Sequence, residues 1–261
     1  MPKKLAKSNT FSTIASSASD LSTASAHLLP ANLPPILTDG GPLPKLFVFD
    51  LDYTLWPFWV DTHVSGSTLK PVPGSNNTSV ADKVGEHYSF YADVPAVLYA
   101  LPLLGVRVGV ASRTCAPDLA REMLKLLHVH PPPPAQTQQQ QQDDYGTGSS
   151  SKKKGSSSGG GGGGGSGSGK PRKAIDLFDA GLEIYPSSKL RHMEALQRRT
   201  GLPYGEFLFF DDESRNRDTE SLGVTMCLVR DGVSWSEVAR GVAEWRRRKA
   251  VSALADGGPA E

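Results

Sequence analysis

The chain has 261 residues, 38% of them hydrophobic, and a formal net charge of +1. A charge so close to zero argues against a nucleic-acid partner, and no apolar run is long enough to cross a membrane. Only two cysteines are present, which predicts no disulfide framework and fits a reducing compartment, so we expect a cytoplasmic protein.

The first 44 residues are rich in serine, alanine, threonine and proline, which predicts a disordered tail over residues 1–44. This segment is poor in acidic residues, as organellar transit peptides are, but its lack of arginine weakens that interpretation. We expect the folded domain over residues 45–250 and a flexible C-terminus over residues 251–261.

The first predicted strand covers residues 46–49, four apolar residues that run directly into Asp50. Asp52 and Thr54 follow at alternate positions, and two carboxylates this close repel each other. The repulsion is tolerable when a divalent cation lies between them or when one carboxyl keeps its proton. The pattern therefore indicates either a Mg²⁺ site, because Mg²⁺ prefers oxygen ligands, or a solvated turn.

An aromatic cluster follows this strand, in which Trp56, Phe58 and Trp59 either flank a substrate or pack the loop. The polar segment that comes next is too short to form a large lid domain. A helix is then predicted, opened by Asp93 and ended by Gly105.

A second predicted strand, residues 106–111, ends in Ser112 and Arg113, and a helix begins at Pro117. Residues 131–172 then interrupt the alternation of strands and helices. They contain runs of four prolines, five glutamines, three lysines and seven glycines, a composition that cannot bury a core. We interpret this segment as a disordered insertion within the domain.

After the insertion, a short strand is predicted over residues 182–185, followed by a helix that Ser188 caps. Lys189 falls in the first turn of this helix, where a positive charge is unfavourable unless an anion lies nearby. We therefore expect Lys189 to serve an anion site, and its removal to cost activity while leaving stability close to wild type.

Residues 207–210 form a third strong apolar strand, which runs into Asp211 and Asp212 and so repeats the arrangement of the first strand. A strand over residues 224–229 and a final helix complete the domain. The basic residues 246–249 are placed at the end of that helix, where the dipole favours cations.

Alternating strands and helices predict an α/β fold, a doubly wound parallel sheet without a large cap domain. Right-handed crossovers place all strand carboxyl ends along one edge of the sheet. The residues expected at this edge carry carboxylates, a hydroxyl and cations: Asp50, Asp52, Ser112, Arg113, Lys189, Asp211 and Asp212. This composition is typical of a site for Mg²⁺ and phosphate.

Four motifs at these positions resemble the ordered motifs of the haloacid dehalogenase (HAD) superfamily. They are residues 49–57 (Phe-Asp-Leu-Asp-Tyr-Thr-Leu-Trp-Pro), 111–114 (Ala-Ser-Arg-Thr), 183–189 (Glu-Ile-Tyr-Pro-Ser-Ser-Lys) and 209–213 (Phe-Phe-Asp-Asp-Glu). The amino-acid sequence of residues 56–63 and 230–232 is similar to that of the magnesium-dependent phosphatase-1 family within that superfamily. The resemblance covers residues 45–245 apart from the insertion, and it implies a Rossmann-like phosphatase domain.

The resemblance also implies a substrate class and a role for each residue. Asp50 would attack phosphorus and form an aspartyl-phosphate, and Asp52 would protonate the leaving oxygen and then activate water. Mg²⁺ would be held by the Asp50 carboxylate, the Asp52 backbone carbonyl and the acidic pair, with Asp212 as the direct ligand and Asp211 as its support. The phosphoryl group would be bound by Ser112, Arg113 and Lys189.

The expected substrates are phosphotyrosine-like aryl phosphates or sugar phosphates, including phosphorylated sugars attached to proteins. The enzyme is expected to be a monomer without nucleic-acid or membrane partners.

Two other functions fit parts of the pattern. Cys115 and Arg121 have the C-x5-R spacing of cysteine-dependent phosphatases. Their loop contains no glycine, Pro117 has no N–H to donate, and Asp118 would repel phosphate, so carboxylate chemistry is the preferred hypothesis. The second alternative is a non-catalytic binding scaffold, but every motif residue expected for catalysis is present.

Overall fold

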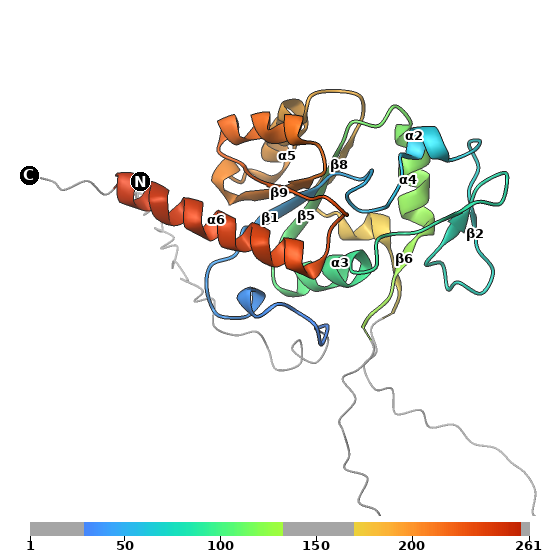
Figure 1. Cartoon of the computed structure of the whole chain (residues 1–261), viewed down its shortest axis with the longest axis horizontal. Coiled ribbons are helices and arrows are strands. Elements are labelled where there is room, and N and C mark those ends of the chain that lie inside the picture. Colours follow the sequence, from blue (N-terminus) through green and yellow to red (C-terminus); the bar gives the residue numbers. More distant parts are fainter. Residues whose placement is uncertain (1–28, 133–169, 257–261) are drawn as a thin grey trace, which may run out of the picture.

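Five parallel strands form the central sheet, in the order β10-β9-β1-β5-β8 (Figure 1). The computed structural model describes residues 29–132 and 170–256. The strands are β1 (Leu46–Phe49), β5 (Arg107–Ser112), β8 (Gly181–Ile184), β9 (Phe207–Asp211) and β10 (Thr225–Leu228). The predicted parallel α/β sheet is confirmed.

The path of the chain through this sheet opens a crevice between β1 and β9. The chain runs outward from β1 to β5 and β8, and then returns to the other side of β1 to form β9 and β10. Ligands of open α/β sheets bind at such a reversal, at the carboxyl ends of the strands. The Asp50 N–H donates to the Phe210 carbonyl at 3.0 Å, so these two strand ends lie level.

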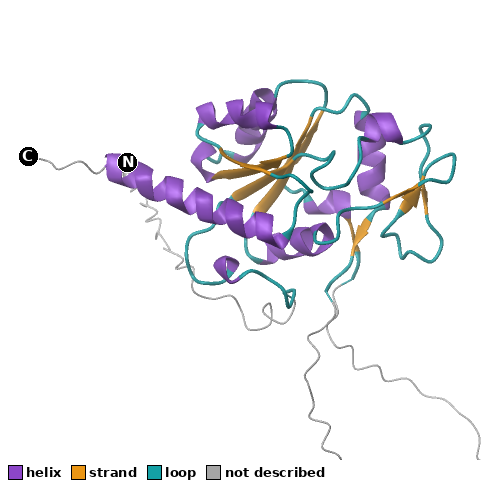
Figure 2. Cartoon of the chain, viewed as in Figure 1, coloured by secondary structure: helices purple, strands orange, loops and turns teal. Residues whose placement is uncertain are grey.

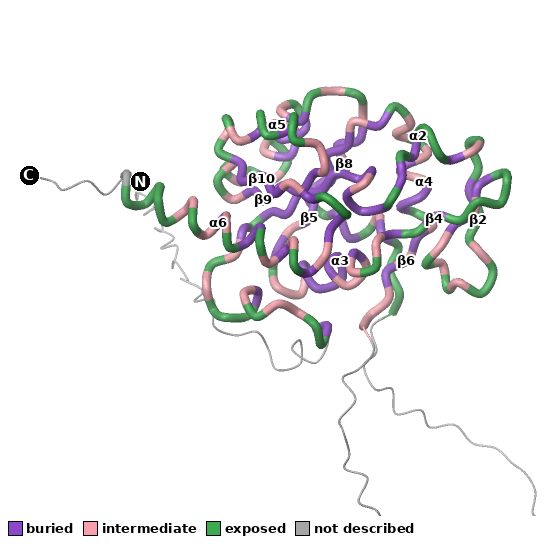
Figure 3. The backbone as a smooth tube through the Cα atoms, viewed as in Figure 1, coloured by how far each residue is buried: buried purple, intermediate pink, exposed green. Residues whose placement is uncertain are grey.

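Helices cover both faces of the sheet (Figure 2). Alternate residues of a strand point to opposite faces, so Phe47 and Phe49 join one core with α3 (Val94–Leu103), α4 (Pro117–Leu126) and α6 (Trp235–Asp256). Leu46 and Val48 join the other core with α5 (Lys189–Thr200). All four side chains are buried, and the strands are the most deeply enclosed part of the fold (Figure 3).

Short elements connect these layers. The helical ones are α2 (Val60–His63), η1 (Pro35–Leu37), η2 (Ala174–Leu177), η3 (Tyr204–Glu206) and η4 (Ser214–Leu222). A small antiparallel sheet, β2 (Lys70–Pro71), β3 (Val80–Ala81) and β4 (His87–Tyr88), occupies the segment between α2 and α3. With only two residues in each strand, this sheet is far smaller than an independent domain.

The predicted disordered tail is wrong for residues 29–44. Leu37 is buried in the core, and the Arg246 guanidinium donates to the Asp39 carboxylate and to the carbonyls of Ile36 and Pro42. Composition missed this segment because its anchor is an arginine two hundred residues away. Residues 1–28 lie outside the described residues.

The predicted C-terminal boundary also needs correction. Helix α6 extends to Asp256, so the basic residues 246–249 lie within the helix and not at its end. Each of them pairs with an acidic side chain, and the acids are Asp39, Glu244, Glu220 and Glu206. No helix of the described residues combines the length and hydrophobicity that a membrane crossing requires.

The ends of the predicted insertion lie side by side. Strand β6 (His128–Val129) pairs in antiparallel fashion with β7 (Arg172–Lys173), so Arg172 belongs to the fold and not to the insertion. Residues 133–169 lie outside the described residues, and the disorder predicted for them stays a prediction.

Replacing residues 133–169 with a short Gly/Ser linker should leave folding and turnover nearly unchanged. The β6–β7 ladder already holds the two ends together, and loop-closure cost changes by only about 0.6 kcal/mol per doubling of length. Denaturant unfolding and turnover of the shortened chain would test this. A matched deletion that also removes β6 and β7 should be clearly less stable, and comparable losses in both variants would contradict the prediction.

Candidate active site

A shallow cavity of about 150 Å³ lies at the carboxyl ends of the central strands. Side chains from the loops after β1, β5 and β9 line it: Asp50, Asp52, Trp59, Asp61, Ser112, Arg113, Thr114, Asp212, Glu213 and Arg215. A cavity of this volume has room for a phosphoryl group, and it is open to solvent. Five of the seven residues predicted at this edge line the cavity. The other two are buried beneath it: Lys189 contacts Asp50 and Asp211, and Asp211 directly precedes Asp212 in the chain.

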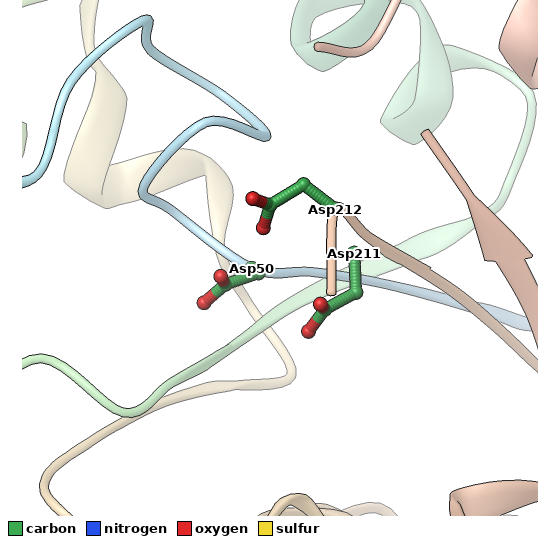
Figure 4. Close-up of side chains that lie close together, drawn as sticks. All are labelled: Asp50, Asp211 and Asp212. Atoms are coloured by element: carbon green, nitrogen blue, oxygen red, sulfur yellow. The ribbon is translucent and has the colours of Figure 1, made fainter. Parts of the chain in front are cut away.

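Three of these carboxylates converge. Asp50, Asp211 and Asp212 each offer one oxygen, and these oxygens all lie within 4.8 Å of one another (Figure 4). Asp50 comes from the end of β1, and the other two come from the end of β9. Oxygen donors at this spacing fit a hard divalent cation such as Mg²⁺, whose charge would offset their mutual repulsion.

Lys189 is buried among these acids, with 1% of its surface exposed. Its Nζ lies 2.7 Å from Asp50 Oδ1 and 2.9 Å from Asp211 Oδ2, and it also donates to the Ala111 carbonyl. Burial lowers the pKa of Lys189, but the charges of the two carboxylates outweigh it, so the net pKa lies above its ordinary value. The predicted anion near Lys189 is therefore, in the described residues, a pair of carboxylates.

The start of α5 brings Lys189 to this place. Ser188 caps the helix, because its hydroxyl accepts a hydrogen bond from the Arg191 N–H at 3.4 Å. Since β8 ends at the same edge as β5, the first residue of α5 lies beside the strand ends that carry the carboxylates.

Asp211 and Asp212 differ in their surroundings. Asp211 is fully buried and accepts hydrogen bonds from Lys189, the Glu213 N–H and the Asn216 amide, which donates to both of its oxygens at 2.9 Å. Asp212 is half-buried, lines the cavity, and receives no side-chain hydrogen bond from the described residues. Burial and then the charge of Asp211 raise the pKa of Asp212 to about 6. This contrast favours Asp212 as a direct metal ligand and Asp211 as its support.

One carboxylate oxygen of Asp52 accepts hydrogen bonds, and the other has no hydrogen-bond partner among the described residues. Asp52 Oδ1 accepts from the Trp56 indole N–H at 2.7 Å and from the Val60 N–H at 3.2 Å, and no described residue bonds to Oδ2. Burial raises the pKa of Asp52 to about 6, although both hydrogen bonds oppose the shift. Burial also raises the pKa of Asp50, against the effect of the Lys189 ammonium. A carboxyl that titrates near neutral pH suits proton transfer.

Ser112 is the last residue of β5 and Arg113 follows it, and both form another part of the cavity wall. Ser112 is buried, and its hydroxyl accepts from the Thr114 N–H at 3.4 Å. The Arg113 guanidinium donates to the Asn216 side-chain oxygen at 3.4 Å. Asn216 thus links Arg113, which lies 103 residues earlier in the sequence, to Asp211.

Sequence reasoning missed several residues of this site: Asp61, Thr114, Glu213, Arg215 and Asn216. Asp61, Thr114 and Glu213 lie within the predicted motifs and Arg215 lies two residues beyond one, but no residue type or spacing marked them as part of the site. Asn216 lies in a 3-10 helix and carries no periodic pattern that would mark it as buried.

The aromatic cluster divides between the two roles that the sequence left open. Trp56 is fully buried and stacks on Phe58 and Phe90, with ring centroids 5.4 Å and 6.0 Å apart. Trp56 and Phe58 therefore pack the loop. Trp59 remains 49% exposed and lines the cavity.

The geometry argues against the cysteine-dependent alternative. Arg121 donates to the backbone carbonyls of Leu182 and Ile184, at 3.0 Å and 3.2 Å, and so braces β8. Cys115 is exposed and does not line the cavity. A thiolate mechanism needs both groups at one phosphate.

Comparisons with known proteins agree with the motifs. The family model for acid phosphatases matches residues 42–248. Magnesium-dependent phosphatase 1 of Homo sapiens is 36% identical over 203 residues, which cover 77% of this chain and 86% of that protein. A HAD-like hydrolase superfamily protein of Schizosaccharomyces pombe is 39% identical over 183 residues, or 70% of this chain and 83% of that protein. A solved Bacteroides fragilis phosphatase domain, complexed with Mg, has 14% identity and a TM-score of 0.36 over 82% of this chain and 44% of that one, too low to add to the assignment.

Proposed function

The chain belongs to the acid phosphatase family and the HAD superfamily and is a phosphatase, and we propose that it hydrolyses phosphomonoesters with Mg²⁺ through an aspartyl-phosphate on Asp50. The observation that carries this proposal is the convergence of Asp50, Asp211 and Asp212 beside one cavity, where the Lys189 ammonium contacts the first two.

In the proposed first step, an Asp50 oxygen forms a bond to phosphorus while the bond from phosphorus to the leaving oxygen breaks. Asp52, held through Oδ1, gives a proton from its open Oδ2 to that leaving oxygen. In the second step, Asp52 takes a proton from water, whose oxygen attacks phosphorus and releases Asp50 and inorganic phosphate.

Three side chains hold the transferring group in this proposal. Lys189 neutralises charge on Asp50, Ser112 donates a hydrogen bond to a phosphoryl oxygen, and Arg113 contacts the phosphate or the substrate. Bound Mg²⁺, held by the carboxylates of Asp50 and Asp212 and the Asp52 carbonyl, supplies the charge that lets a phosphate dianion approach these acids.

The proposed substrates are aryl phosphates of the phosphotyrosine type or sugar phosphates, free or attached to proteins. In support, the cavity is shallow and no large cap covers it within the described residues, so a leaving group can extend into solvent. Turnover of a panel of phosphomonoesters, with and without Mg²⁺, tests the reaction and the substrate class together.

Removal of the metal should abolish turnover. Excess EDTA should stop hydrolysis, and added Mg²⁺ should restore it, because the single charge of Lys189 does not offset three carboxylates, whose oxygens lie within 4.8 Å of one another, and a phosphate dianion. Mg²⁺ alone should also raise the melting temperature, since a ligand of the native state stabilises it by about 2.7 kcal/mol at one hundred times its Kd. Asp212→Asn should reduce this thermal shift, and full activity in excess chelator would contradict the metal requirement.

A further inference from the structure

A tryptophan is exposed at the catalytic cavity. Trp59 exposes 49% of its surface, and it is the only aromatic one among the four large hydrophobic side chains that the described residues expose. The other three, Val84, Val251 and Leu254, do not line the cavity, whereas Trp59 does. Aromatic rings carry a large apolar contact area and line many ligand sites, so an exposed ring in a cavity wall is suited to ligand contact.

The Trp59 ring is held in place by its neighbours. It stacks on the His63 imidazole, with centroids 5.6 Å apart and an angle of 10° between the planes, and it makes an edge contact with Tyr53 at 5.1 Å. The backbone N–H of Trp59 also donates to His63 Nδ1 at 3.0 Å, which orients the imidazole. A ring supported in this way loses little freedom when a ligand stacks on it, which favours binding.

Trp59 is close in sequence to a residue that binds Asp52, which bears on the part of a substrate that Trp59 would contact. Trp59 directly precedes Val60, whose N–H donates to Asp52 Oδ1 at 3.2 Å. Asp52 is the group that protonates the leaving oxygen in the proposed function, so the leaving group emerges beside Asp52. The exposed Trp59 ring lines the same cavity as Asp52, so a leaving group that emerges beside Asp52 can reach it.

We propose that Trp59 is a specificity-determining residue that contacts the leaving group and selects phosphomonoesters whose ester oxygen is attached directly to a ring. Aryl esters and pyranose 1-phosphates both offer a flat apolar face to the indole, whereas acyclic esters such as glycerol 2-phosphate and phosphoserine do not. This inference rests on the proposed function, since it assigns the leaving group to the side of Asp52.

Steady-state kinetics of Trp59→Ala on four substrates tests the proposal: phenyl phosphate, glucose 1-phosphate, glycerol 2-phosphate and phosphoserine. KM for one or both ring-bearing esters should rise by about tenfold with kcat little changed, while kcat/KM for the acyclic esters stays within about twofold. Trp59→Phe should keep most of the preference. The matched control Val84→Ala removes an exposed apolar side chain away from the cavity and should change nothing.

The two ring-bearing substrates identify the class that Trp59 recognises. A KM increase confined to phenyl phosphate would assign an aryl leaving group, and one confined to glucose 1-phosphate would assign a sugar. An equal loss of kcat/KM on ring-bearing and acyclic esters would show that Trp59 only supports the structure of the loop. No change of kcat/KM on any ester would show that Trp59 does not contact the substrate. Either result overturns the proposal.

Tryptophan fluorescence provides a readout that does not depend on turnover. The chain has four tryptophans, and Trp56, Trp235 and Trp245 are buried. When phenyl phosphate and Mg²⁺ are added to the Asp50→Asn protein, its emission should therefore change through Trp59. The same titration of the double variant Asp50→Asn/Trp59→Phe should show no change. Failure of the proposed function would appear differently, as wild-type enzyme without Mg²⁺-dependent turnover on any of the four esters.

Discussion

Asp50→Asn should lose essentially all turnover, by roughly three orders of magnitude or more, while Cys115→Ser keeps most of it. Asparagine is nearly the same size as aspartate, but its amide cannot attack phosphorus. Asp50 lines the cavity beside Lys189, whereas Cys115 lies outside the lining. Turnover of the two variants on one substrate, beside the exposed control Asp218→Asn, separates the carboxylate and thiol mechanisms.

Chemical trapping should agree with the variants. Beryllium fluoride with Mg²⁺ should inhibit the wild-type enzyme by mimicking an acyl phosphate on Asp50, and it should not bind Asp50→Asn. Iodoacetamide should alkylate the exposed Cys115 with little inhibition. An active Asp50→Asn protein together with an inactive Cys115→Ser protein would overturn the whole mechanism.

Lys189→Met should lose turnover by about a hundredfold or more, and it should also unfold more easily. The expectation from sequence, that stability would stay close to wild type, assumed an accessible lysine. Lys189 is instead buried between Asp50 and Asp211, and its removal leaves two acids facing each other without a cation. Breaking a buried ion pair by removing one partner costs about 3–5 kcal/mol.

The stability loss of Lys189→Met should depend on the metal. Denaturant unfolding in EDTA should show the full loss, and Mg²⁺ should recover part of it, because the cation also offsets repulsion among the acids. The control Lys125→Met removes an exposed lysine that pairs with Glu122, and it should change stability by less than about 1 kcal/mol. A Lys189→Met protein with wild-type turnover would remove Lys189 from the mechanism.

The sequence alone was sufficient to predict the five strands of the central sheet and which polar residues lie at their carboxyl ends. Each central strand is a short apolar run that is buried on both faces, and such a run is visible in local sequence. The polar residues that end these runs, Asp50, Ser112 and Asp211, come together because parallel strands carry their carboxyl ends to one edge. This inference needs only the direction of the strands, and not their order.

Only the tertiary structure decided what depends on strand order and long-range packing. The return of the chain from β8 to β9 places Asn216 between Arg113 and Asp211, and no local pattern encodes that link. The burial of Lys189 likewise depends on which strand ends surround the start of α5. Trp56 and Trp59 are only three positions apart, yet one packs the core and the other lines the cavity, because composition and spacing record the type of side chain and not the neighbours it meets.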